Sequence, residues 1–435
     1  MKNILFISNY PPKGSLHGSH FGGVASYTKN TIKAINNAYN LQNEKVSFTV
    51  LADRFNGYNT KLTTTVVSCL ECPNGYKNYK EGNVEVKRVW NRNDWFLLDK
   101  LLLQVLKTKN TKDIFIAFEF SLFGLNKFIT LAFPFFILFL RLFGKNVYLV
   151  LHHVLLDINK VDGQLGVTKN SIYSKLYGVV LKLFYKLVCL FASKIVVFEE
   201  HLKQDLLGLK ISNNKIVTIN HGVEKVSTNI TKAQARKKLG FSNDDFVVLN
   251  FGFIAWYKGS DWLVSAFKSL IDSNQINKNV KLVMAGGFSR NHKDNRVYNK
   301  MYEKIEGIAD GYYDQIQLTG FVPEDKIQLY FEACDLVVLP YRVMLSASGP
   351  FSLVLSYKKP FVLSSNLDGY MLNNDFKQSM QESNVTKKDL FFNLSNSALL
   401  NALDTDKKVL ENFSKNLAQK RSWDSIGKQY AMLLK

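Results

Sequence analysis

The chain has 435 residues, of which 46% are hydrophobic and 21% charged. This length allows two domains with packed cores and excludes a disordered or fibrous protein. The formal net charge is 56 − 36 = +20, and residues 1–224 carry 28 − 15 = +13 of it. A basic first half favours anionic partners such as phospholipid surfaces or diphosphates. Nucleic acid ranks last among them, because the sequence has no recognised nucleic-acid motif.

Four cysteines are too few for a disulfide framework in a chain of this length: Cys69, Cys72, Cys189 and Cys334. Cys69-x-x-Cys72 is a lone pair, and a structural zinc site would need two more ligands. The apolar run at the N-terminus is too short for a signal peptide before Pro11-Pro12 ends it. We therefore expect reduced thiols, no metal and a cytoplasmic protein.

The first predicted strand is Asn3–Ser8, and a glycine-rich segment leads from it to a helix from about Ala25 to Ile35. Glycines such as Gly22 and Gly23 let backbone N–H groups approach a phosphate or sugar closely. A merely flexible loop is the equal alternative. Further strands are expected at Val46–Leu51 and Val84–Val89.

An apolar run of thirteen residues, Phe128–Leu140, follows a predicted helix at Phe96–Leu106 and a predicted strand at Ile114–Phe118. Its length is too short to span a bilayer as a helix. The run predicts a buried or half-buried helix, with shallow membrane insertion as the alternative. The next predicted strand is Val147–Leu151.

Two histidines, His152 and His153, close that strand at its carboxyl end, where open α/β sheets place their ligand groups. A histidine in such a place is more often a packed or capping residue. The next helix, Ile172–Ser193, combines an apolar stripe with a basic face of Lys175, Lys182 and Lys186. That pattern suits an interfacial helix, and an amphipathic core helix with solvated lysines explains it equally well.

The second half is organised around Phe246–Leu263 (FVVLNFGFIAWYKGSDWL). A buried strand leads through Gly252 and Lys258 into a helix, and helix starts after parallel strands bind anions. Further along, Pro340-Tyr341-Arg342 follows another apolar strand, and Ser348 is a plausible N-cap ahead of Gly349. Ordinary loops with solvated side chains are the alternative to a binding site.

These segments together resemble family 4 glycosyltransferases, which are retaining sugar transferases. Gly252–Gly259 (GFIAWYKG) is similar to the family's G-R-L-x-P-E-K-G signature. The pieces around it follow in the family's order: Lys232–Val248, Val280–Gly287, Ile316–Pro323 and Ala333–Tyr341. No piece is specific alone, but the ordered set is, and the resemblance is strongest from Ile216 to Ser364.

The resemblance implies a GT-B fold, in which two Rossmann-like α/β domains face each other across a cleft. It places an acceptor-side domain at residues 1–224 and a nucleotide-sugar domain at residues 225–412. Residues 413–435, which include Ser422-Trp423-Asp424, would cross back to the first domain.

The resemblance also assigns roles to residues. Lys258 would hold the donor diphosphate together with Gly252, Gly22 and Gly23. The base would lie against Gly320, Phe321 and Val322, and His152, which matches the histidine of a T-x-H-D segment, would contact the transferred sugar. No metal and no other cofactor is implied.

The sequence departs from the family pattern at three positions. Leu345 and Leu353 stand where two glutamates are usual, and Phe253 replaces an arginine of the first signature. We expect Arg342 to supply the missing cation, since its planar fork suits phosphate. Ser348 and Gly349 would complete the diphosphate site.

The sequence therefore predicts a metal-independent, retaining glycosyltransferase that uses a nucleotide-diphosphate sugar. The basic, aromatic first domain suggests a saccharide or lipid-linked acceptor in envelope polysaccharide or glycolipid assembly, at the inner face of the cytoplasmic membrane. Two other functions stay open: a non-catalytic partner subunit, suggested by Leu345 and Leu353, and a sugar-nucleotide epimerase.

Overall fold

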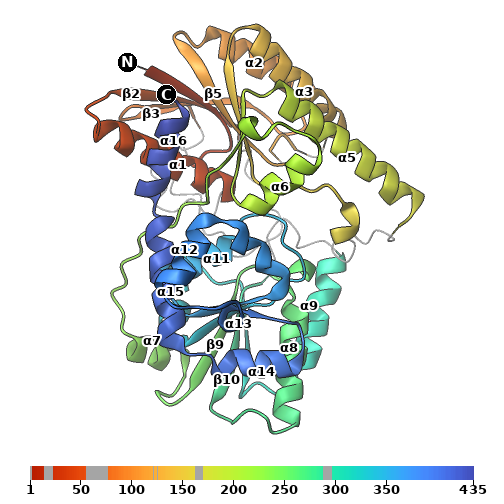
Figure 1. The fold of residues 1–435 in the computed structure, drawn as a ribbon, viewed down its shortest axis with the longest axis vertical. Helices are drawn as coiled ribbons and strands as arrows, with labels where there is room; N and C mark the ends of the chain where they lie inside the picture. The colour runs from red at the N-terminus through yellow and green to blue at the C-terminus, as the bar shows by residue number, and fades with distance from the viewer. Residues whose placement is uncertain are drawn as a thin grey trace. The chain divides into compact units, whose positions relative to one another are not determined.

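The computed structural model describes residues 2–13, 23–54, 77–120, 122–124, 126–161, 170–287 and 296–435. They form two compact units (Figure 1). Unit 1 comprises residues 1–156, 179–222 and 423–435, and unit 2 comprises residues 157–178 and 223–422. The predicted C-terminal segment began at residue 413, whereas residues 413–422 belong to unit 2 and only Trp423–Lys435 to unit 1.

Unit 1 is built on one sheet of eight strands in the order β3-β4-β2-β1-β5-β6-β7-β8. All neighbours are parallel except β3 and β4. The strands are β1 (Lys2–Ile7), β2 (Val46–Asp53), β3 (Tyr79–Glu81), β4 (Val84–Trp90), β5 (Thr111–Phe118), β6 (Asn146–Leu151), β7 (Lys194–Val197) and β8 (Ile216–Thr218).

Helices cover both faces of this sheet. Successive side chains of β1 point to opposite faces, and both sets are apolar, so both faces need a cover. Leu5 and Ile7 contribute to one core, with α2 (Leu97–Lys107), α3 (Lys127–Leu142), α5 (Ile172–Phe191) and α6 (Glu200–Gly208). Phe6 faces the other way, where its ring stacks on Phe115 at 5.0 Å and Phe115 meets Tyr430 at 5.8 Å. Tyr430 lies on α16 (Trp423–Leu433), which packs against α1 (Gly23–Asn40).

The apolar run at Phe128–Leu140 forms most of α3, and Pro134 lies inside the helix without ending it. Pro134 is buried, and its neighbours Phe133, Phe136 and Ile137 belong to the core of unit 1. Proline removes one backbone hydrogen bond from a helix interior. Here the burial of one apolar face outweighs that loss, so tertiary packing overrides the local preference.

Unit 2 has a second sheet of six parallel strands in the order β11-β10-β9-β12-β13-β14. The strands are β9 (Phe246–Phe251), β10 (Val280–Ala285), β11 (Ile316–Gly320), β12 (Leu336–Leu339), β13 (Phe361–Ser364) and β14 (Phe391–Phe392). The central strand β12 is apolar and buried along its whole length, as expected of a strand buried on both faces, whereas the edge strand β11 contains Gln317 and Thr319 and is mostly half-buried.

The helices of unit 2 are α7 (Lys232–Leu239), α8 (Ser260–Asp272), α9 (Arg296–Ala309), α10 (Ile327–Ala333), α11 (Gly349–Ser356), α12 (Asn374–Glu382), α13 (Lys387–Leu390), α14 (Asn396–Asp404) and α15 (Lys407–Lys420). Helix α8 packs with α9 and α14, and α15 packs with α11 and α12. Two parallel, helix-covered sheets confirm the predicted α/β class with two Rossmann-like domains. None of the described helices is long and apolar enough to cross a bilayer.

Candidate functional site

The sheet of unit 2 changes direction between β9 and β12. From β9 the chain adds β10 and β11 on one side, and it then returns to place β12 against the other side of β9. Ligands of open α/β sheets bind beside the carboxyl ends of strands at such a switch point. The segments that follow these two strands contain Gly252, Lys258, Arg342 and Ser348, so the fold places all four in one region of unit 2.

Lys258 lies on a single 3₁₀ turn, Trp256–Lys258, between β9 and α8. Only 8% of the residue is exposed, and burial lowers the pKa of its ammonium group to about 8. Among the described residues, its Nζ atom has no carboxylate or hydrogen-bond partner, and it lies 5.9 Å from the centroid of the Tyr257 ring. A buried cation without an anion nearby is costly, and a bound anion would relieve that cost.

Glycines bring the backbone close to this lysine. Gly252 has φ +119°, and a Cβ atom there would lie 3.2 Å from Nζ of Lys258 and 2.6 Å from Cγ of Pro350. Gly259 has φ +70°, and a Cβ atom would lie 2.0 Å from the carbonyl oxygen of Pro340. The loops after β9 and β12 therefore touch at positions where only glycine fits.

Arg342 is tied to the turn that carries Lys258. Its backbone N–H donates to the carbonyl of Tyr257 at 2.7 Å, and Nη1 donates to the carbonyl of Trp256 at 2.6 Å. Nη1 also donates to Oδ1 of Asp261 at 2.7 Å. The sequence suggested Arg342 as a cation for phosphate, and the structure adds that Asp261 already pairs with part of its guanidinium. Arg342 therefore positions the Lys258 turn.

Asp261 was missed by the sequence reasoning. It lies in the first turn of α8, only 6% exposed, and Lys304 on α9 contacts its other oxygen at 3.3 Å. Burial alone would raise the pKa of Asp261, but the hydrogen bonds and charges of Arg342 and Lys304 outweigh it and lower the pKa. In the sequence, an acidic residue in the first turn of a helix is explained by its favourable interaction with the helix dipole. Its pairing with Arg342 is therefore visible only in the fold.

Ser348 caps α11, as predicted from the sequence. Its hydroxyl accepts from the N–H of Phe351 at 3.3 Å and lies 2.9 Å from the hydroxyl of Tyr341. In the first turn of α11, the N–H of Phe351 is bonded to Ser348 and Pro350 has no N–H. Among the described residues, the N–H of Gly349 is therefore available to an anion at this end of the helix.

The segment at the end of β11 lies beside the Gly252 loop. Gly320 forms an isolated bridge with Gly286, and a Cβ atom on Gly286 would lie 1.9 Å from the carbonyl oxygen of Gly252. Phe321 and Phe253 are 43% and 45% exposed, and their rings stack with centroids 6.5 Å apart. Val322 is buried in the core of unit 2. Phe253, which departs from the family signature, thus extends the flat surface expected to meet a base.

Leu345 and Leu353 are both half-buried, and Leu353 packs against the core of unit 2. Neither side chain can accept a hydrogen bond. Among the described residues, no group of three or more His, Cys, Asp or Glu side chains is placed to hold a metal ion. Cys189 and Cys334 are buried thiols, and Cys69 and Cys72 lie outside the described residues.

In unit 1, His152 follows β6 and belongs to an aromatic cluster. Its ring meets Tyr27 and Phe198 edge-on, with centroids 5.0 and 4.9 Å away. Burial lowers the pKa of His152 well below its usual value, and His221 and His153 act in the same direction. Its Nε2 atom is buried and has no hydrogen-bond partner among the described residues. His152 is therefore a neutral imidazole.

Trp423 and Gly222 complete this cluster. The ring of Trp423 lies 5.8 Å from Tyr27, and a Cβ atom on Gly222 would lie 2.3 Å from that indole. The sequence singled out His152 and Trp423 separately, but nothing in it joined them to Tyr27. Of the predicted glycine pair, Gly22 lies outside the described residues and Gly23 is the exposed first residue of α1.

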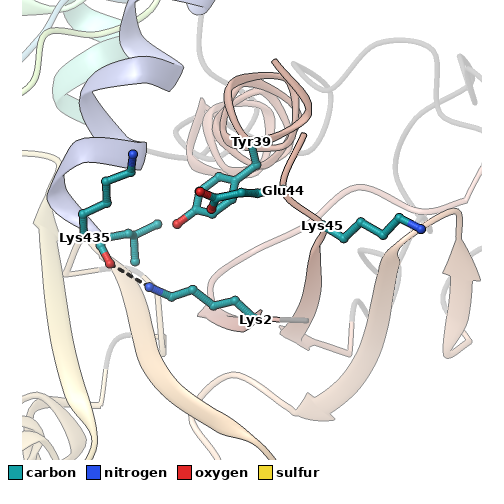
Figure 2. Close-up of a pocket in the computed structure, with 6 residues that line it drawn as sticks. Lys2, Tyr39, Glu44, Lys45 and Lys435 are labelled. Atoms are coloured by element: carbon teal, nitrogen blue, oxygen red, sulfur yellow. Dashed lines mark hydrogen bonds between the residues drawn. The ribbon is translucent and has the colours of Figure 1, made fainter. Parts of the chain in front are cut away.

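An open pocket in unit 1 is lined by Lys2, Tyr39, Glu44, Lys45, Leu434 and Lys435 (Figure 2). Lys2 donates to the carbonyl of Leu434 at 2.7 Å and pairs with Asp113 at 3.0 Å. Lys2 begins β1, so the pocket lies at the amino ends of the parallel strands. Ligand groups of such sheets lie at the opposite, carboxyl ends, which favours the Lys258 region as the site.

Comparison with known proteins gives a match between residues 231–367 and the family described as glycosyl transferases group 1. An uncharacterized glycosyltransferase of Methanocaldococcus jannaschii is 22% identical over 250 residues, which cover 54% of this chain and 58% of that protein. The match to that curated relative thus spans little more than half of its length.

Solved structures match over the whole chain. Sucrose-phosphate synthase from Thermosynechococcus elongatus has a TM-score of 0.62 and 15% identity, covering 100% of this chain and 98% of that one. HepE of Anabaena, in complex with UDP-glucose, has a TM-score of 0.61 and 15% identity, covering 100% and 99%. At such identities the likeness shows the fold, and it is the GT-B fold.

Proposed function

Because residues 231–367 match the glycosyl transferases group 1 family and the whole chain has the GT-B fold, we propose that this protein transfers a sugar from a nucleotide-diphosphate sugar. The observation that carries the proposal is Lys258, a buried ammonium with no anionic partner among the described residues, at the switch point of a parallel sheet. The similarity to a protein with UDP-glucose bound supports a nucleotide sugar as donor.

Lys258 and the N–H of Gly349 hold the diphosphate in this proposal. As the glycosidic bond breaks, negative charge grows on the diphosphate, and a fixed ammonium in a water-poor site stabilises it. Arg342 and Asp261 hold the turn on which the lysine lies, and an N–H of Arg342 not used by Asp261 or Trp256 extends to the phosphate. Phe253 and Phe321 offer their exposed rings to the base.

We propose that transfer proceeds with retention and without a metal ion. The acceptor hydroxyl then attacks on the face from which the nucleotide leaves. His152 acts on the transferred sugar as a neutral hydrogen-bonding group, since its low pKa prevents it from carrying a proton at neutral pH. The acceptor is a saccharide or a lipid-linked saccharide, in envelope polysaccharide or glycolipid assembly at the inner face of the cytoplasmic membrane.

A panel of nucleotides and nucleotide sugars, read by thermal shift, tests the donor. A bound donor raises the melting temperature by mass action, and the largest shift identifies base and sugar. Incubation of the best donor with saccharide acceptors should give a product whose anomeric configuration matches the donor. A donor that binds without transfer or hydrolysis would indicate a non-catalytic partner subunit. An isomerised nucleotide sugar would indicate an epimerase, and no binding at all would contradict the proposal.

A further inference from the structure

Helix α3 is apolar on all sides, although only one side is buried in unit 1. Ile129, Phe133, Ile137 and Leu140 face the core. On the opposite side, the exposed fractions run from 50% to 72% for Phe128, Leu131, Phe135, Phe139 and Leu142. These five follow each other at intervals of three or four residues, so they form one continuous stripe along the helix.

The second half of α5, Val179–Phe191, extends this stripe. Val179, Leu183 and Leu190 are 62%, 55% and 62% exposed, while Tyr185 and Val188 on the opposite side are buried in the core. Phe191 lies with its ring 6.5 Å from that of Phe135, which joins the two helices (Figure 1). We call these exposed side chains of α3 and of Val179–Phe191 the α3–α5 surface.

Trp95, in the segment before α2, borders this surface. Its side chain is 66% exposed, and its ring lies 5.6 Å from that of Phe128. A contiguous apolar patch of this extent is unusual on a monomeric protein and marks an interaction site. Among the described residues of 223–422, the larger segment of unit 2, the exposed large apolar side chains are scattered: Phe253, Tyr313, Phe321 and Leu372.

All charged residues of α3 and α5 are basic. The two helices contain Lys127, Arg141, Lys175, Lys182 and Lys186, and no aspartate or glutamate. Lys182 follows the exposed Val179, and Lys186 follows the exposed Leu183, by three positions, so on α5 the cations border the apolar stripe. Long basic side chains beside apolar ones suit the boundary between lipid headgroups and acyl chains, where the ammonium groups reach the phosphates.

We infer that the α3–α5 surface docks onto an anionic phospholipid bilayer. A second copy of the chain fits less well, because self-pairing through one surface would bring lysines against lysines. A bilayer offers apolar depth and negative charge together, and lies flat against two adjoining helices. The inference deepens the proposed function, since it names the surface by which a lipid-linked acceptor is reached. Lipid binding is nevertheless measured without any transfer.

Flotation of the full chain with vesicles tests the inference. We expect binding to vesicles of phosphatidylcholine with phosphatidylglycerol, weakened by salt, and little binding to phosphatidylcholine alone. Equal binding to both vesicles, or binding to neither, would overturn it. A dimer in scattering measurements that Leu142→Gln abolishes, without vesicle binding, would assign the surface to a second copy instead.

Matched variants locate the surface. Leu142→Gln on α3 should weaken vesicle binding about tenfold, because one inserted leucine side chain leaves the lipid. Leu41→Gln changes an equally exposed leucine elsewhere in unit 1 (74% against 72% exposed) and should leave binding unchanged. Lys186→Gln should cost about fivefold, the contribution of one basic residue at an anionic surface. Lys237→Gln on α7 should cost nothing.

Trp95 provides a readout of depth. Lipids brominated on the acyl chains should quench its fluorescence in the wild type, and Trp95→Phe should lose that quenching while the other tryptophans stay unquenched. Unchanged melting temperatures would show that the variants fold. Equal losses for Leu142→Gln and Leu41→Gln, or quenching that persists in Trp95→Phe, would place the docking surface elsewhere. Nucleotide-sugar binding is measured separately, so a failed vesicle experiment leaves the donor proposal standing.

Discussion

The two parallel sheets end in regions of opposite chemistry. Beyond β9 and β12 of unit 2, the loops hold Lys258, Arg342 and Asp261, and charge determines what can bind. Beyond β6 of unit 1, His152 is packed among the rings of Tyr27 and Phe198, and its nitrogen chemistry is that of a neutral group. The same sheet architecture thus presents a buried cation in one unit and an aromatic, uncharged environment in the other.

The contrast extends to the helices. Helix α8 of unit 2 buries Leu263, Val264, Phe267 and Leu270, and its exposed positions are polar. Helix α3 of unit 1 buries one apolar side and exposes a second one. A surface helix that is apolar on every side exposes an apolar face to solvent, and such a face marks an interaction site. In our proposals, unit 2 therefore binds the nucleotide and unit 1 contacts the lipid.

Replacing Lys258 should have the largest effect. Lys258→Met keeps most of the volume and removes the charge, so nucleotide-diphosphate binding should weaken by about tenfold or more, from the loss of one charge-assisted contact of roughly 1.5–3 kcal/mol. Transfer should fall further than binding. Calorimetry with the nucleoside diphosphate measures the loss, and Lys237→Met serves as a control. Unchanged affinity in Lys258→Met would remove the anion site from unit 2.

The pH dependence of donor binding should follow the same lysine. The free protein has a Lys258 pKa of about 8, and a bound diphosphate should raise that pKa. Binding then takes up a proton above pH 8, so affinity should be constant below about pH 8 and fall about tenfold per pH unit above it. Lys258→Arg, which stays charged, should bind with a flat profile. A falling profile in that variant would assign the effect to another group.

Variants of Arg342 and Asp261 should show whether Arg342 contacts the phosphate directly or only holds the Lys258 turn. Arg342→Ala should weaken nucleotide-diphosphate binding about tenfold, since either role loses one charge-assisted contact. Asp261→Asn distinguishes the roles, because it leaves the guanidinium without its carboxylate. If Arg342 contacts the phosphate, Asp261→Asn should bind as well as the wild type or better. If Arg342 only holds the Lys258 turn, both variants should lose affinity alike. Wild-type binding and turnover in Arg342→Ala would exclude both roles.

Gly252→Ala should disturb the site through shape alone. Its Cβ atom would lie 2.6 Å from Pro350 and 3.2 Å from Nζ of Lys258, at a φ that alanine rarely adopts. We expect a loss of about 1–3 kcal/mol in the free energy of unfolding, measured by denaturant. Gly307→Ala on α9 is the matched control, because a Cβ atom there meets nothing within 4 Å. That variant should gain about 0.5–1 kcal/mol.

His152→Ala should have the smallest effect on donor affinity. Transfer should slow several-fold while nucleotide-diphosphate binding stays within about twofold, as expected for a contact with the transferred sugar. The wild-type rate should show no step near pH 6.5, because the low pKa of His152 keeps its ring neutral there. Loss of the folded state in His152→Ala would instead show that the ring serves packing alone.

The sequence by itself determined the element order, the α/β class and the residues at the strand ends. Apolar runs such as Val46–Leu51 and Phe246–Leu249 become the buried strands β2 and β9 because a parallel sheet needs apolar side chains on both faces. Gly252 and Lys258 could be recognised because strand, glycine and helix start are neighbours in sequence. The roles proposed for Lys258, Arg342 and His152 stay predictions.

Only the tertiary structure decided which residues meet. Asp261 and Arg342 are 81 positions apart, and no local pattern indicates that the carboxylate of Asp261 pairs with the guanidinium of Arg342, which the sequence predicts to bind phosphate. Tyr27, His152 and Trp423 likewise come together from three distant segments. The sequence left open whether Phe128–Leu140 is buried or inserts into lipid, and the fold answers that one side is buried and the other exposed. Periodicity shows that a helix is apolar; the space beside it determines which of its sides is covered.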